Sequence, residues 1–138
     1  MEPDARGRRR AHDARGRIDL TMPKRAPAVQ FRVRITKGDD IAIGPGKVDL
    51  LEAIGETGSI TSAAKRLGMS YRRAWLLIDT MNRCFKNPIV EAEAGGQRGG
   101  GTRLTVTGRD VIRRYRAIER KAEKAAAADL AALIKLLG

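Results

Sequence analysis

The chain has 138 residues, enough for one domain of ordinary size, and 28 Lys and Arg against 16 Asp and Glu give it a formal net charge of +12. Such an excess favours a polyanionic partner, because neutralised phosphates supply much of a protein's affinity for nucleic acid. One cysteine, Cys84, excludes an internal disulfide and is expected to be buried, while a single histidine, His12, argues against a Cys/His metal site and a histidine-based triad.

Residues 1–29 are rich in arginine, contain prolines and offer no apolar face that a core could bury. We therefore predict a disordered basic arm over this segment, without the apolar centre of a secretory signal. The arm either adds phosphate contacts or is a dispensable extension, and the second interpretation is the one that we favour.

The next elements are a hairpin and a helix. Apolar and basic residues alternate over 31–36, turn residues occupy 37–40, and the alternation resumes over 41–43, which predicts two short antiparallel strands. A Gly-Pro-Gly break then precedes a predicted helix over 46–57, whose core side carries Val48, Leu51 and Ile54 with Leu50 beside them.

Two short helices joined by a tight turn follow. Counted from Ile60, the small Ala64 falls fifth, Gly68 ninth and Ala74 fifteenth, which are the positions of helix crossing and of the turn in a helix-turn-helix unit. Gly68 adopts a left-handed backbone at little cost, and a serine precedes each helix where it can cap free N–H groups. This geometry directs the second helix outward, where it can enter a DNA major groove.

Two predicted strands, 88–93 and 103–107, enclose a glycine-rich stretch over 94–102 that is unsuited to regular structure. Strands with a flexible tip directly after a helix-turn-helix form a wing. The predicted fold is therefore mainly α with small β-hairpins: a winged helix-turn-helix domain over 30–107.

A long helix is predicted from Thr107 or Gly108 onward, so residues 108–138 are treated as a separate element. Its apolar residues recur at spacings of three and four, and so narrow a stripe over many turns usually needs a partner helix. We predict dimerisation through a stripe that includes Tyr115, Ile118, Ala122, Leu130, Leu133 and Leu137.

The candidate DNA contacts lie in three places. The first exposed turn of the second helix presents two arginines, which can each donate two hydrogen bonds to guanine or can simply contact phosphates. The start of the first helix offers hydroxyl groups to phosphate, and the glycine-rich wing brings two polar side chains toward the minor groove. The predicted set is Ser59, Thr61, Ser62, Lys65, Ser70, Tyr71, Arg72, Arg73, Gln97 and Arg98. Trp75 is expected to pack beneath the wing.

No convergent carboxylate pair, metal-binding cluster or nucleophile elbow is recognisable, so we expect neither an enzyme nor a cofactor. No apolar run reaches the roughly 20 residues that span a bilayer, which favours a cytoplasmic protein with no membrane partner.

Four segments together resemble the N-terminal domain of the ModE family, the molybdate-dependent transcriptional regulators: 58–64 (GSITSAA), 69–75 (MSYRRAW), 81–82 (MN) and 95–101 (GGQRGGG). The resemblance covers roughly Phe31 to Glu123. The first segment with the following leucine is also similar to LysR-type regulators, and the Ser-Tyr-x-x-Ala-Trp element with the glycine-rich wing favours ModE.

The resemblance implies a dimeric winged-helix protein that binds DNA through residues 70–73 and the wing, and that controls molybdate uptake or molybdoenzyme genes. Full-length family members also carry a C-terminal module of small β-barrels that binds the oxyanion. Because this sequence ends at Gly138, no molybdate binding is expected of it.

Our leading hypothesis is a homodimeric regulator of a pseudo-palindromic operator. Two alternatives stay open: a DNA-binding protein of low specificity, and an adaptor whose long helix pairs with another regulator such as a longer paralogue.

Overall fold

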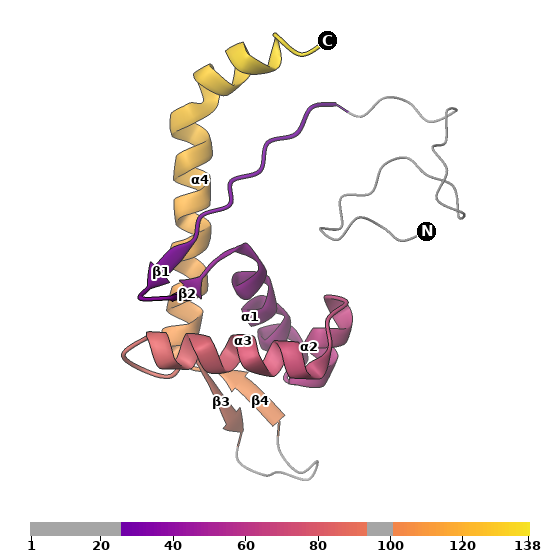
Figure 1. Cartoon of the computed structure of the whole chain (residues 1–138), viewed down its shortest axis with the longest axis vertical. Helices are drawn as coiled ribbons and strands as arrows, with labels where there is room; N and C mark the ends of the chain where they lie inside the picture. The colour runs from indigo at the N-terminus through magenta and orange to yellow at the C-terminus, as the bar shows by residue number, and fades with distance from the viewer. Residues whose placement is uncertain (1–25, 94–100) are drawn as a thin grey trace, which may run out of the picture.

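The computed structural model describes residues 26–93 and 101–138 (Figure 1). Most of the predicted basic arm (1–25) and the tip of the predicted wing (94–100), with Gln97 and Arg98, lie outside the described residues. The elements in chain order are β1 (Ile35–Lys37), β2 (Asp40–Ile43), α1 (Pro45–Thr57), α2 (Ile60–Arg66), α3 (Tyr71–Cys84), β3 (Val90–Glu93), β4 (Gly101–Leu104) and α4 (Val106–Ile134). The three shorter helices and the β3–β4 hairpin form one body, from which α4 projects (Figure 1).

The helix-turn-helix forms as its sequence predicts. Ser59 and Ser70 directly precede α2 and α3 as their caps, and each side-chain oxygen accepts a hydrogen bond from a backbone N–H three residues on, at 3.1 and 3.0 Å. Gly68 has a φ of 69°, the left-handed conformation that the turn requires. Ala64 and Ala74 are both buried, so the two helices pack closely.

The buried apolar side chains of the described residues form one hydrophobic core beneath these helices. Its largest fully buried side chains come mostly from α1, which confirms the predicted core side of that helix: Val48, Leu50, Leu51, Ile54, Met81 and Ile89. Burying each such side chain contributes roughly 1.5–3 kcal/mol relative to leaving it exposed. Helix α1 therefore lies at the centre of the core, and α3 and strand β4 of the wing pack against it.

The first hairpin is shorter than predicted. Phe31 and Val33 are half-buried, as the alternation suggests, but only Ile35–Lys37 pair with β2. The register shifts between Ile35 and Thr36, and this irregularity leaves Ile35 exposed rather than on the buried side.

The wing strands and the last helix also differ from their predicted bounds. β4 starts at Gly101, inside the stretch predicted to be irregular, because Gly101 and Thr102 pair with Glu93 and Ala92 of β3. Thr102 N–H also donates to the Gly58 carbonyl at 3.0 Å. α4 starts at Val106, one or two residues before the predicted start at Thr107 or Gly108. Thr105 causes this early start, since its hydroxyl oxygen accepts from Gly108 N–H at 3.0 Å and thereby caps the helix.

Candidate nucleic-acid interface

Helix α3 presents one face to the core and the other to solvent. Ala74, Ile78 and Met81 are buried, which follows from their spacing of three and four residues. Arg72 and Arg73 lie in the first turn of the exposed side. The two arginines predicted to contact DNA bases thus lie at the exposed N-terminal end of α3, whose opposite face packs in the core.

The hydroxyl groups of the serines that cap α2 and α3 can still donate a hydrogen bond. Ser59 and Ser70 use their oxygens as acceptors within the chain, so each hydroxyl hydrogen is left for another acceptor. Thr61, Ser62 and Lys65 are exposed on α2. This arrangement suits the phosphate contacts predicted for these residues, which stay a prediction.

Positive charge is concentrated at the N-terminal half of α3. Within residues 26–93 and 101–138, Arg72 and Arg73 take part in no ion pair, whereas Arg83, at the other end of the helix, pairs with Asp79 at 3.1 Å and with Asp40 at 3.5 Å. The helix end that would enter a groove is therefore the one with uncompensated cations.

Lys47 adds to this positive region from α1. Partial burial lowers the pKa of Lys47, and the nearby positive charge of Arg73 lowers it further. Lys47 therefore lies near enough to Arg73 to feel its charge.

Asn82 fastens the wing to α3, a role that the sequence reading missed. Its side-chain oxygen accepts from the backbone N–H groups of Ile89 and Val90 at 2.9 and 3.3 Å, and its side-chain nitrogen donates to the Val90 carbonyl at 3.1 Å. The sequence did contain a sign of this role: Asn82 directly follows Met81, so a polar amide lies at the margin of an otherwise apolar helix face.

Trp75 does not pack beneath the wing as predicted. Its exposed fraction is 47 %, and it is not among the apolar residues that pack against the core. The neighbouring Leu76 is 46 % exposed, and sequence reading did not single it out. The outward face of α3 thus carries apolar as well as basic side chains.

The predicted dimerisation stripe stays a prediction, and Tyr115 does not lie on an open surface that a second copy could contact. That side chain is buried within its own chain, and its hydroxyl donates to the Val33 carbonyl at 2.7 Å. The residues Ile118, Leu133 and Leu137 are exposed, while Ala122 and Leu130 are half-buried. Apart from Val106 in its first turn, the exposed large apolar side chains of α4 lie after Tyr115.

Arg116 joins α4 to α1. Its guanidinium contacts Glu52 through two nitrogens at 3.1 and 2.5 Å, Asp49 at 2.9 Å and Glu119 at 2.8 Å. Hydrogen bonding to Glu52 above all raises the pKa of Arg116 beyond its usual value. Together with Tyr115, this network fixes the direction in which α4 leaves the body.

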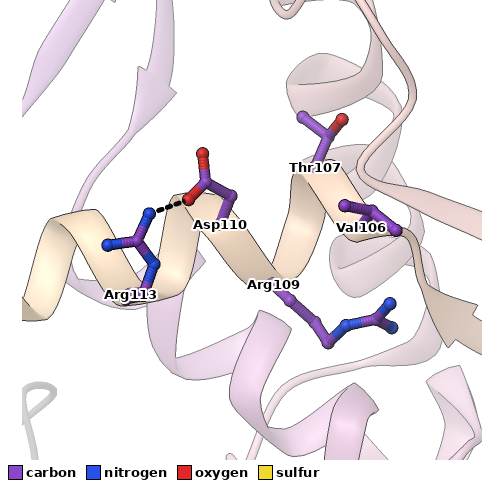
Figure 2. A pocket seen from close by; sticks show the side chains of 5 residues that line it. All are labelled: Val106, Thr107, Arg109, Asp110 and Arg113. Carbon is purple, nitrogen blue, oxygen red and sulfur yellow. Dashed lines mark hydrogen bonds and ion pairs between the residues drawn. The ribbon is translucent and has the colours of Figure 1, made fainter.

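The first turns of α4 line a shallow hollow formed by Val106, Thr107, Arg109, Asp110 and Arg113 (Figure 2). Arg113 is turned toward Asp110, with which it pairs, and Arg109 donates to the Leu104 carbonyl at 3.1 Å. The charged groups of the hollow are thus engaged with their own chain. Their hydrogen bonds support the start of α4 rather than a ligand.

The described residues contain no group of three or more His, Cys, Asp or Glu side chains that could hold a metal ion. In the same part of the chain, no helix is both long and apolar enough to cross a membrane.

Three helices with a helix-turn-helix, followed by a hairpin and a long helix, define a winged helix-turn-helix domain. The DNA-binding domain of CbnR, solved in complex with DNA, has the same fold: it superimposes with a TM-score of 0.50 over 64 % of this chain and 95 % of that domain, at 23 % identity. Residues 46–109 match the family described as bacterial regulatory helix-turn-helix protein, lysR family.

Within this class, the domain is ModE-like in sequence. The molybdenum transport protein ModE of Azotobacter vinelandii is 45 % identical over 94 residues, which cover 67 % of this chain and 35 % of that protein. The molybdenum-pterin-binding protein MopB of Rhodobacter capsulatus is 47 % identical over 77 residues (56 % and 28 %), and the transcriptional dual regulator ModE of Escherichia coli K12 is 38 % identical over 81 residues (59 % and 31 %). The chain spans about a third of the length of these relatives.

Proposed function

We propose that the protein is a homodimeric, sequence-specific transcriptional regulator of the ModE type that acts on molybdate transport or molybdoenzyme genes. The fold and the similarity to ModE proteins support the class of function. The relatives' names, which refer to molybdenum transport and to transcriptional regulation, support the choice of target genes.

One observation carries the DNA-binding part of this proposal: α3 presents Arg72 and Arg73 without ion-pair partners among the described residues, at the free end of a helix-turn-helix. An arginine at this position can contact a guanine through two hydrogen bonds or a phosphate through its charge. The caps at Ser59 and Ser70 hold both helix ends in place for such contacts.

The homodimer is proposed from the far end of α4. Leu133 in the last turn of α4 and Leu137, three residues past the end of the helix, are each 60 % exposed and lie beyond the part of α4 that packs on its own domain. Pairing with the same stripe of a second copy removes this surface from water and places two recognition helices in two half-sites of an operator.

The test is selection of preferred sequences from random duplexes by the purified chain, followed by binding curves on the selected and on random DNA across salt concentrations. We expect a sequence with two related half-sites, bound more than about a thousandfold tighter than random DNA. Equal affinities would instead make the chain a non-specific DNA-binding protein.

Two double variants locate the interface. Arg72→Ala with Arg73→Ala should weaken binding to the selected site by at least about tenfold, and Arg120→Ala with Lys121→Ala, an equal loss of charge on the exposed surface of α4, serves as the matched control. An adaptor protein would tolerate both pairs equally.

The target genes are tested by mapping genomic binding sites with and without molybdate in the medium. Sites upstream of genes for molybdate uptake or molybdoenzymes are the expected result. Sites that lie elsewhere would contradict the assignment of targets and leave the DNA-binding proposal standing.

A further inference from the structure

Helix α3 carries an exposed apolar patch that neither the core nor an ion pair explains. We define this patch by Trp75 and Leu76, whose exposed fractions are 47 and 46 %. Leaving two large apolar side chains in water on a polar helix face forgoes the stabilisation that burial gives, so their exposure points to a partner surface.

The patch lies one turn behind the arginines of the same face. Leu76 follows Arg72 by four residues and Arg73 by three, and these spacings place side chains next to one another on a helix. Polar groups further along are engaged within the helix: Thr80 donates its hydroxyl to the Leu76 carbonyl at 3.0 Å, and Asp79 binds Arg83. The middle of the face is therefore apolar, with free cations only on its N-terminal side.

We propose that the patch of Trp75 and Leu76 contacts thymine methyl groups in the major groove and so specifies T·A pairs beside the bases or phosphates reached by Arg72 and Arg73. This inference rests on the proposed DNA-binding function and adds a specificity to it. The thymine 5-methyl is the apolar group that the major groove displays, and apolar side chains contact it.

The adjoining cations favour DNA as the occupant over a protein. An apolar patch flanked by two arginines without carboxylate partners complements a surface that is both apolar and anionic. A major groove offers both, because its methyl groups lie between two phosphate backbones. The patch also belongs to the helix whose N-terminal residues face the groove in this class of domain.

The experiment replaces single thymines of the selected operator by deoxyuridine, which removes the methyl group and leaves every hydrogen-bonding group unchanged. For the unaltered protein we expect a loss of about fourfold per contacted methyl, the factor that corresponds to burying one such group. With the same position changed in both half-sites, the expected loss is about fifteenfold.

Variants of the patch connect the effect to these side chains. In Leu76→Ala and Trp75→Ala, at least one of the sensitive thymines should become indifferent to loss of its methyl group, whereas Leu76→Met, which keeps an apolar side chain, should retain the sensitivity. Ile35→Ala is the matched control, since Ile35 has a similar exposed fraction of 49 % and lies on β1.

Four results would overturn the inference. Deoxyuridine without effect at every thymine, or with equal effect in the protein and in both alanine variants, would remove the methyl contact and leave the regulator proposal intact. A monomeric Leu76→Ala variant in sedimentation would instead assign the patch to a protein interface. Failure of the selection to yield any preferred sequence would reject the proposed function, and this inference with it.

Discussion

Asn82 is the residue whose removal tests most directly how the wing is held. The side chain makes three hydrogen bonds to the backbone of Ile89 and Val90, at 2.9, 3.1 and 3.3 Å. Both of those residues are buried, Ile89 fully, so water replaces the lost partners poorly. The variant Asn82→Ala therefore leaves buried backbone groups unpaired at the point where the chain turns from α3 into β3.

The size of the effect follows from these contacts. An unsatisfied buried group costs about 1–3 kcal/mol, and the greater helix propensity of alanine offsets about 0.5 kcal/mol of the loss. Because Asn82 is half-buried and water reaches part of the site, we expect the free energy of unfolding to fall by about 2–3 kcal/mol in total. For a domain of this size the midpoint of thermal unfolding should fall by about 10–20 °C.

The assay is urea or thermal unfolding at one fixed protein concentration, because the proposed dimerisation would make stability depend on concentration. Amide hydrogen exchange adds the local readout: the N–H groups of Ile89 and Val90 should lose protection first. Asn87→Ala is the control, an identical change at an exposed position that should alter the free energy of unfolding by less than about 0.5 kcal/mol. An unfolding free energy of Asn82→Ala within that same range would refute the reasoning.

Three further changes test other contacts. Gly108→Ala should destabilise the domain by more than about 2 kcal/mol in denaturant titration, since an added Cβ would lie 2.1 Å from the Ile89 carbonyl oxygen; a neutral result would mean that α4 shifts freely there. Tyr115→Phe should cost about 1 kcal/mol by the same measurement through loss of its hydrogen bond to Val33, and an unchanged midpoint would show that water replaces it fully. Arg116→Met should cost about 1–2 kcal/mol at low salt because its three carboxylates lose their common partner, and the difference should shrink in 1 M salt, whereas a salt-independent loss would indicate packing instead of charge.

Local signals in the sequence predicted the helix-turn-helix well. The capping serines and the turn at Gly68 act through backbone groups only a few residues away, so their roles can be read without the rest of the fold. The core side of α1 followed equally from spacing, because α1 is buried on the side where its apolar residues recur.

Local signals in the sequence could not predict contacts between residues that are far apart in the chain. Tyr115 fits the apolar stripe of α4, and its burial depends on the Val33 carbonyl, 82 residues earlier. Thr102 at the start of β4 likewise donates to the carbonyl of Gly58, the residue that follows α1 and lies 44 residues earlier. Trp75 sits at the edge of the buried arc of α3, where periodicity does not decide between the core and solvent.

The joint between α1 and α4 has a geometrical consequence for the proposed dimer. From Arg116 to the end of α4 the helix extends for roughly 27 Å at 1.5 Å per residue. A rotation of about 7° at the joint then displaces the far end by about 3.4 Å, the rise of one base pair. In a dimer joined at the far ends of its two α4 helices, the ion pairs of Arg116 would limit this rotation. They would thereby limit how many base pairs can separate the two half-sites of an operator.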